Sequence, residues 1–569
     1  MKEIRMIIAL VLGVLTVQIK AQTLNWKAFE YGKYPWIDSN VNVIQTHRKS
    51  VIAPLMNKLK KTNKKRVHIL HIGDSHVQAD IFTHETRTLL GSTFGHAGRG
   101  MIFPYTTART HTAADYRSRH TGKWYYARNV ERLPELPLGV TGITSRTYDP
   151  QSAFKLNFIE GAIRPEFTRL RILMDRSPRS FDLRIISGRD TVKVDVFNSD
   201  IDSLSDQLFV DMPRGNSEYL FELRKTDSGQ SQFEIYGLSI ESPEDRGLLY
   251  SSVGINGAGH YSVMRENKLP QHLQDLKPDA IILDVGANDF YQKGMEQQRF
   301  KDNLVSIIEM FKTYAPDAVV ILSNSQDIHR GGYSVRACSI FSTMISDVAK
   351  SENVAFYDWY RVAGGNQSMK IWKSVQLANR DGVHLTRDGY ELKGSLIYQS
   401  FGRTYRRFFN SPNKETSIII PCLDPSQLDS VELSKELLGK EKKWLEHEVK
   451  KGETAWGIAQ MYNVSVIQLK EWNRLGGYAL REGQLLRVFT EFEIQALPAR
   501  RSVNSVDVNV PKKNKRTPRN QSATQYHTIQ RGETLYSIAR KYRMSVSEIK
   551  QLNNMRSSDI RAGKRLKVK

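Results

Sequence analysis

Residues 67–80 read VHILHIGDSHVQAD, and this stretch decides the fold of the larger part of the chain. A continuous apolar run of β-forming residues, typical of a strand buried on both faces of a parallel sheet, ends at Gly73, and residues with helical spacing follow. Ser75 therefore lies where a buried strand turns into a helix. Ligands bind at the carboxyl ends of parallel strands, so this position suits a functional side chain.

Three later apolar runs have the same character and alternate with helical stretches such as 334–352. They are AIILDVG (280–286), AVVILSN (318–324) and VAFYDWY (354–360). Strands that alternate with helices predict a parallel sheet covered by helices on both faces, which is a three-layer α/β fold.

Between about 110 and 248 the helical period disappears and short alternating runs replace it. These runs are FKLNFI (154–159), FTRLRILM (167–174), SFDLRIIS (180–187), TVKVDVF (191–197), QLFVDM (207–212), EYLFELRK (218–225) and QFEIYGLSI (232–240). Alternation of this kind predicts an all-β sandwich inserted into the α/β domain.

Four polar or glycine-rich blocks occur in a fixed order. They are Gly73-Asp74-Ser75-His76, SSVGINGAGH (251–260), LDVGANDF (283–290) and DGVHL (381–385). Together they resemble the blocks of the SGNH (GDSL) hydrolases over about residues 60–108 and 249–410, with His76 where that family usually has Leu. The resemblance implies an SGNH-type fold and a serine esterase without a cofactor. The inserted sandwich resembles the carbohydrate-module-like insert of bacterial peptidoglycan O-acetylesterases, which also carry Gly-Asp-Ser-His. The alternative is a scaffold that only walls the active site.

A serine hydroxyl is a weak nucleophile and needs a base within hydrogen-bond reach, which a third group must orient. Asp381 and His384 are three residues apart, so in a helical turn they share a face, and the imidazole can join Asp381 to Ser75. These three residues are the predicted catalytic triad. The predicted oxyanion donors are the N–H groups of Ser75 and Gly257 and the side-chain amide of Asn288.

Neighbouring residues are predicted to be structural. Asp74 caps or braces the turn, and Asp289 braces its own loop. His76 points away from Ser75 on a locally extended backbone and is packed rather than reactive. Residues 91–100 (GSTFGHAGRG) form a turn-rich wall of the pocket. No set of residues has the spacing of a metal site.

The last quarter of the chain contains an internal repeat with a period of 80 residues. HEVKKGETAWGIAQMYNVSVIQLKEWN, from His447, aligns without a gap with HTIQRGETLYSIARKYRMSVSEIKQLN, from His527. Each copy predicts a small βααβ unit and resembles the LysM domain. The resemblance implies binding to N-acetylglucosamine-containing glycans such as peptidoglycan or chitin. The candidate contacts are Gly452, Thr454, Gly532 and Thr534.

The N-terminus combines MKEIR, the apolar run MIIALVLGVLTVQI and Lys20-Ala21-Gln22. This is the layout of a secretory signal with a cut after Ala21, and the run is shorter than the roughly 20 residues that a spanning helix needs. We therefore expect export to the periplasm or cell envelope, or secretion, and no transmembrane segment after signal removal. Cys338 and Cys422 are too few for a disulfide scaffold, and they either pair or remain separate thiols.

The formal net charge is +23, and from Glu441 onward 26 Lys and Arg residues face 12 Asp and Glu residues. A basic tail is typical of nucleic-acid binding, but an exported chain meets envelope polymers and membrane surfaces instead. The basic tail therefore either meets an envelope polymer or a membrane surface or is a solvated face that aids solubility, and we expect no nucleic acid as a partner.

We expect an exported serine esterase that removes O-acetyl groups from a cell-wall glycan, with peptidoglycan as the first candidate. The alternatives are an esterase or acetyltransferase that acts on another acylated carbohydrate, and a non-catalytic wall-binding protein. The predicted segments are a signal peptide (1–21), the SGNH domain in two parts (22–109 and 249–410), the inserted sandwich (110–248), a connector (411–445), the first LysM domain (446–489), a flexible basic linker (490–525) and the second LysM domain (526–569). The stretch PSQLDSVELSKELLGKEKKWLE (425–446) is predicted to make the connector helical.

Overall fold

The structure, a computed structural model, describes residues 24–410 apart from 198–204, 292–296, 331–332 and 336, together with parts of 440–493 and 526–568. Contacts divide the chain into two units, Met1–Glu432 and Leu433–Lys569, and each unit is described by itself. The predicted signal peptide lies outside the described residues, as do 411–439 of the predicted connector and 494–525 of the predicted linker.

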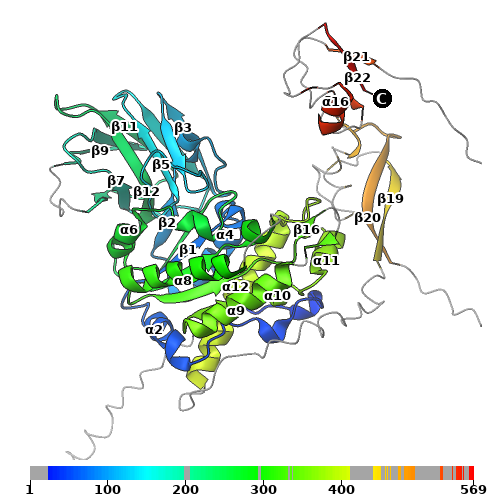
Figure 1. The fold of residues 1–569 in the computed structure, drawn as a ribbon, viewed down its shortest axis with the longest axis horizontal. Coiled ribbons are helices and arrows are strands. Elements are labelled where there is room, and N and C mark those ends of the chain that lie inside the picture. The colour runs from blue at the N-terminus through cyan, green and yellow to red at the C-terminus, as the bar shows by residue number, and fades with distance from the viewer. Residues whose placement is uncertain are drawn as a thin grey trace, which may run out of the picture. The chain divides into compact units, whose positions relative to one another are not determined.

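A five-stranded parallel sheet forms the centre of the first unit, as predicted (Figure 1). In order across the sheet the strands are β13 (Leu248–Gly254), β1 (Val67–Gly73), β14 (Ala280–Asp284), β15 (Val319–Ser323) and β18 (Ala355–Tyr357). Every residue of β1 and β13 is buried, which explains why these strands have continuous rather than alternating apolar runs.

Helices cover both faces of this sheet because successive side chains of a strand point to opposite faces. On β1, Val67 and Ile69 pack into one hydrophobic cluster, whereas Leu70 and Ile72 pack into another. The first cluster includes residues of α2 (Lys49–Leu59), α4 (Phe82–Phe94) and α12 (Arg387–Asn410). The second includes residues of α6 (Leu269–Leu276), α8 (Gln297–Tyr314) and α9 (Ala337–Ser351). The sheet and its two helical layers are the predicted three-layer fold.

Short helices and turns lie after the carboxyl ends of the strands and within the loops that connect the larger elements. The α-helical ones are α3 (Ser75–Gln78), α5 (His260–Val263), α7 (Ala287–Tyr291), α10 (Trp359–Val362) and α11 (Ser368–Ser374). The remaining small elements are η1 (Tyr31–Lys33), η2 (Ser39–Val41), η3 (Tyr105–Ala108) and the hairpin of β16 (His329–Arg330) and β17 (Tyr333–Ser334). Within the described residues, no helix combines the length and the apolar character that crossing a membrane requires.

The predicted all-β insertion is a sandwich of two antiparallel sheets, gathered at one end of the first unit (Figure 1). One sheet contains β10 (Gln207–Asp211), β7 (Arg169–Met174), β12 (Phe233–Glu241), β5 (Ile143–Thr147) and β4 (Tyr125–Arg128), with β2 (Gly98–Ile102) also paired to β12. The other contains β3 (Tyr116–Thr121), β6 (Ala153–Phe158), β11 (Glu218–Arg224), β8 (Asp182–Ser187) and β9 (Asp190–Val194). A separate hydrophobic cluster fills the space between them.

Residues 91–100 were predicted to form a wall of the pocket, and that prediction is wrong. The segment instead contains the end of α4 and the start of β2, and none of its residues lines the pocket described below. Gly98 and Gly100 lie at positive φ, and a Cβ on either would fall 2.5 Å from Ile240 O or 2.7 Å from Tyr250 O. The glycines therefore serve close strand packing, so that β2 joins the sandwich ahead of the predicted start at 110.

A buried charge cluster joins the sandwich to the α/β domain. Asp80 and Arg87 come from the region of α3 and α4, Arg99 lies in β2, and Asp115 directly precedes β3. Arg99 Nε lies 2.9 Å from Asp115 Oδ2, Arg99 also pairs with Asp80, and Arg87 Nη2 lies 2.8 Å from Asp80 Oδ2. Burial alone would raise the pKa of Asp115, but Arg99 holds that pKa well below its ordinary value. The cluster is therefore charged at neutral pH.

Replacing Asp115 with Ala is expected to lower the free energy of unfolding by about 3–5 kcal/mol, because Arg99 would keep a buried charge that has lost a partner. Asp211→Ala is the matched control, since it breaks an exposed pair with Arg169 and is expected to cost about 1 kcal/mol or less. Urea unfolding monitored by fluorescence measures both. Equal losses in the two variants would contradict this role of the charge cluster.

The pairing of Asp115 with Arg99 makes the free energy of unfolding depend on pH. The pKa of Asp115 is lower in the folded than in the unfolded chain, so its contribution is present above the ordinary aspartate pKa of about 3.9 and is lost as the pH falls below it. The difference in the free energy of unfolding between wild type and Asp115→Ala, measured by urea unfolding, should therefore become smaller below about pH 3.9.

The second unit contains two small cores. One lies beneath β19 (Lys440–Glu448) and β20 (Leu485–Glu493), and the other includes β21 (Tyr526–Thr528), β22 (Arg565–Lys567) and α16 (Val546–Leu552). Residues 425–446 were predicted to form a helical connector, but their described end belongs to β19, because it pairs along its length with β20. The predicted glycan contacts Gly452, Thr454, Gly532 and Thr534 lie outside the described residues.

Candidate active site

Ser75 begins α3, directly after the carboxyl end of β1, as the sequence predicts. Asp74 is the N-cap of this helix, and its side chain accepts a hydrogen bond of 3.0 Å from the backbone N–H of His76. The predicted capping role of Asp74 is thus confirmed. A strand-to-helix turn of this kind presents the serine hydroxyl and the first free N–H groups of the helix to the same space.

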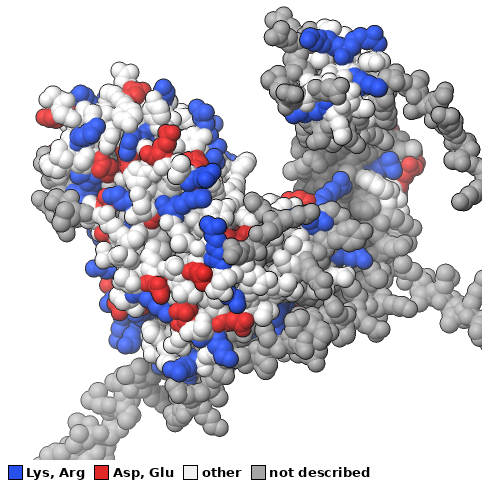
Figure 2. All heavy atoms as spheres, viewed as in Figure 1, with Lys and Arg blue, Asp and Glu red and all other residues white. Residues whose placement is uncertain are grey.

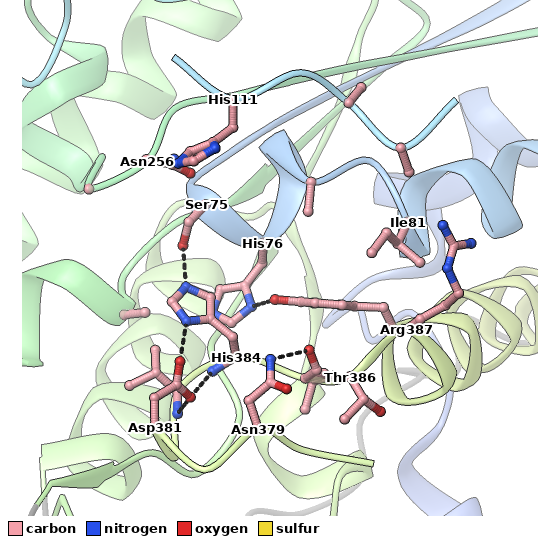
Figure 3. A pocket seen from close by; sticks show the side chains of 18 of the residues that line it. Ser75, His76, Ile81, His111, Asn256, Asn379, Asp381, His384, Thr386 and Arg387 are labelled. Carbon is pink, nitrogen blue, oxygen red and sulfur yellow. Dashed lines mark hydrogen bonds and ion pairs between the residues drawn. The ribbon is translucent and has the colours of Figure 1, made fainter. Parts of the chain in front are cut away.

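The structure brings Ser75, His384 and Asp381 together in a line (Figure 3). Ser75 Oγ lies 3.1 Å from His384 Nε2, and His384 Nδ1 lies 2.8 Å from Asp381 Oδ2. Asp381 and His384 occupy a loop rather than the expected helical turn, and Asp381 Oδ1 holds this loop by accepting hydrogen bonds from the N–H groups of Val383 and His384. Burial opposes ionisation of Asp381, but these hydrogen bonds outweigh it and lower the pKa.

The predicted oxyanion donors lie around Ser75 in the same pocket. Gly257 adopts a φ of +87°, a conformation that favours glycine, and its N–H donates to no described residue. Asn288 is already engaged, because its Nδ2 donates to Ala258 O at 2.9 Å and to Asp74 Oδ2 at 3.4 Å. The second contact is at the edge of hydrogen-bond range, so one N–H of Asn288 has only a weak acceptor.

His76 is packed, as predicted, although its backbone is helical rather than extended. Its Nδ1 lies 2.7 Å from the hydroxyl of Tyr390, and its ring centre lies 5.2 Å from that of His384. Burial lowers the pKa of His76 to about 3, so this imidazole stays neutral beside His384. Burial and then the nearby Asp284 carboxylate raise the pKa of Asp74 to about 7.

A buried ion pair lies below the site, and the sequence patterns did not reveal it. Lys393, from α12, places its Nζ 3.0 Å from Asp284 Oδ2 at the end of β14, and His71 Nε2 lies 3.5 Å from the same oxygen. Burial would raise the pKa of Asp284, but Lys393 lowers it well below the ordinary value. The only sequence signal is a lysine on the buried face of an amphipathic helix.

Asp289 braces a different loop from the one predicted. Its carboxylate accepts a hydrogen bond of 3.1 Å from the N–H of His260, and its Oδ2 lies 3.0 Å from His260 Nδ1. Asp289 thereby ties α7 to the start of α5, which directly follows the loop that carries Gly257.

Ser75, His384 and Asp381 line a pocket of about 1080 Å³. Besides Ser75, Asp381 and His384, its lining comes from α3 and the turn after it, the loop after β13, α7, the loop before α12, the start of α12, and residues 111–114 and 117 of the insertion. Figure 3 shows His111 and Asn256 close to Ser75 and Arg387 farther along the pocket. Sequence reasoning missed the contribution of 111–117, because this segment is irregular and has no periodicity that points to a site.

The visible surface of the first unit carries charges of both signs. Figure 2 shows Lys and Arg interspersed with Asp and Glu over the visible face of the first unit, whereas the visible charged residues of the second unit are mostly Lys and Arg. In the part of the chain that the structure describes, no group of three or more His, Cys, Asp or Glu side chains has the arrangement of a metal site. Cys338 is buried with a free thiol, and Cys422 lies outside the described residues.

Two family models match the chain. The GDSL-like lipase/acylhydrolase family matches residues 241–392, and the LysM domain matches residues 447–489 and 527–569. The first match covers the glycine, Asn288 and Asp381–His384 blocks but not Ser75.

Curated relatives resemble a part of the chain. The cell wall-binding protein YocH of Bacillus subtilis is 31% identical over 121 residues, which are 21% of this chain and 32% of the relative. The N-acetylmuramoyl-L-alanine amidase sle1 of Staphylococcus aureus is 30% identical over 122 residues, again 21% of this chain and 32% of the relative. The chain thus spans about a third of the length of these relatives.

A solved structure described as a peptidoglycan O-acetylesterase in action shares the fold. It has a TM-score of 0.54 and 21% sequence identity, and the alignment covers 64% of this chain and 99% of that one.

Proposed function

We propose that this chain, an esterase with a GDSL-like acylhydrolase domain and two LysM domains, removes O-acetyl groups from peptidoglycan at the cell envelope after export. The observation that carries the proposal is the hydrogen-bonded line from Ser75 through His384 to Asp381 in an open pocket, in a chain that also has two LysM domains. The wall-related names of YocH, the amidase and the structural neighbour agree with this substrate class.

The proposed reaction follows from the geometry. Ser75 Oγ attacks the acetyl carbonyl carbon while His384 Nε2 takes the hydroxyl proton, and Asp381 orients the ring and stabilises the imidazolium. The negative charge that forms on the carbonyl oxygen faces the N–H groups of Ser75 and Gly257 and the amide of Asn288. When the sugar oxygen leaves, it receives the proton from His384. Water then attacks the acetyl-serine by the same route, which releases acetate and restores Ser75.

Asn288 Nδ2 is expected to exchange its 3.4 Å contact with Asp74 for the substrate oxygen during this reaction. Asn288→Ala should therefore lower kcat on a small acetyl ester by about 10²- to 10³-fold, because one oxyanion donor is lost. Steady-state kinetics with the purified variant measures this. An unchanged kcat would remove Asn288 from the oxyanion site.

Acetate release tests the substrate. The purified protein should release acetate from O-acetylated peptidoglycan at a higher kcat/KM than from acetylated xylan, and Ser75→Ala should release it from neither. Rapid release from xylan with none from peptidoglycan would instead support an esterase for another acylated carbohydrate.

A further inference from the structure

We propose that Arg117, carried by the sandwich insertion, is a specificity-determining residue that binds a carboxylate substituent of the glycan beside the ester being cleaved. This inference rests on the proposed function and names a chemical feature of the substrate. It requires that the insertion be part of the site, that its position relative to Ser75 be fixed, and that Arg117 have donors available for an anion.

The insertion forms part of the pocket that contains Ser75. Residues 111–114 and Arg117, which lead into and begin β3, line the same pocket as Ser75 and His384. Figure 3 shows His111 of this segment beside Ser75, with Asn256 next to it. A glycan that places its acetyl group at Ser75 must therefore pass the insertion.

Hydrogen bonds tie this segment directly to the helix that begins with Ser75. Gln78, in α3, donates through Nε2 to Thr110 Oγ1 at 3.1 Å and to His111 O at 3.0 Å. The Gln78 Oε1 accepts from the N–H of Asn256 at 2.6 Å, so one side chain connects three walls of the pocket.

Two more contacts hold the part of the segment nearest Arg117. The N–H of Ala114 donates to Ala79 O at 3.1 Å. Asp115 is fixed by the charge cluster, and the hydroxyl of Tyr116 donates to Phe103 O at 2.8 Å. Arg117 thus follows a rigid anchor, and a rigid anchor lets a long side chain recognise a ligand with less loss of entropy.

Arg117 is exposed, and only part of its guanidinium is used within the protein. Its Nη1 donates to Ala113 O at 3.1 Å and to Tyr116 O at 3.0 Å, which orients the group. Among the described residues it forms no ion pair, and its Nε and Nη2 donate to no protein acceptor. An oriented guanidinium with free donors matches the planar geometry of a carboxylate.

The other charges of the pocket lining are already paired. Arg387 Nη1 lies 3.3 Å from Glu391 Oε1, and Asp381 Oδ2 lies 2.8 Å from His384 Nδ1. Arg117 therefore leaves an uncompensated positive charge in the described lining, which attracts an anionic substrate and not a neutral one. Peptidoglycan carries carboxylates on its peptide branches, whereas a neutral acetylated glycan has no such group.

The test compares two O-acetylated peptidoglycan fragments that differ only in whether their carboxylates are free or converted to amides. Wild type should have the lower KM for the free acid. Arg117→Gln should raise KM for the free acid by roughly 10- to 100-fold and bring the KM values of the two fragments together. Arg117→Lys should give an intermediate KM, because it keeps the charge but not the planar donor pair.

Arg119→Gln is the matched control. Arg119 lies two residues further along β3, so it is on the same side of the strand, is exposed, and does not line the pocket. It should keep the wild-type ratio of KM values, and thermal unfolding checks that both variants are folded. If Arg117→Gln keeps that ratio, or if Arg119→Gln loses it equally, the inference is wrong. If wild type releases no acetate from either fragment, the proposed function fails as well.

Discussion

Ser75→Ala is expected to lower kcat on a small acetyl ester by roughly 10⁴-fold or more, because the covalent route through Ser75 Oγ is lost. His384→Ala should cost a similar factor, since no base would remain within reach of the hydroxyl. The double variant should be little worse than either single variant, because the residues act as one unit. Hydrolysis of a chromogenic acetyl ester, followed with each purified variant, provides the measurement.

Asp381→Ala should also be strongly impaired, although by a smaller factor than the loss of the nucleophile. The Asp381 carboxylate orients His384 and also accepts the N–H groups of Val383 and His384, so its removal loosens the loop as well. Asp381→Asn separates these effects, because it keeps an acceptor oxygen for the loop but removes the charge. Wild-type turnover in Ser75→Ala would show that the triad assignment is wrong.

A chain that ends at Gly439 is expected to hydrolyse a soluble small ester at nearly the wild-type rate, because every described residue of the site lies in the first unit. On insoluble sacculi the same truncation should lose binding and much of the rate. Two tethered weak sites raise the effective concentration of the enzyme at the wall, a gain that can reach ~10²- to 10⁴-fold.

Salt separates two contributions to that binding. Attraction between the basic 441–569 region and anionic polymer should weaken at high ionic strength, whereas contacts with N-acetyl groups should persist. Co-sedimentation of full-length and truncated protein with sacculi at low and high salt measures both. If the two chains sediment equally, the LysM domains do not anchor this enzyme.

Strand β1 and the turn that follows it could be predicted because their sequence signal is local. The apolar run of β1 ends at the residues that form the turn, and both its bounds and the position of Ser75 follow from that change of pattern. Asn288 could be expected near Ser75 because both follow the carboxyl ends of parallel strands, which meet at one edge of the sheet. The pairing of Asp381 with His384 could be expected from their spacing and from the resemblance of DGVHL (381–385) to the family block. The roles of these residues in catalysis remain predictions.

Other features depend on contacts between segments far apart in the chain. In β2, Gly98 and Gly100 resemble turn residues, yet they are required for close strand packing. The hydrogen bonds from Gln78 to residues 110–111 form only when the sandwich packs on α3. The same packing places Arg117 in the pocket lining. Residues 440–446 have a composition that suits a helix, but pairing with β20 decides their structure.

The place of the insertion in the chain also sets the order in which the molecule can fold. β13 lies beside β1 in the parallel sheet, and His68 Nε2 contacts Ser251 Oγ across 183 residues of sequence. β1, which precedes Ser75, therefore cannot pair with β13 until the whole sandwich has been synthesised. Contacts between such distant residues slow folding, because a long loop must close before they form. Until β13 and β14 are in place, both edges of β1 remain unpaired, and an unpaired strand edge favours association with other chains.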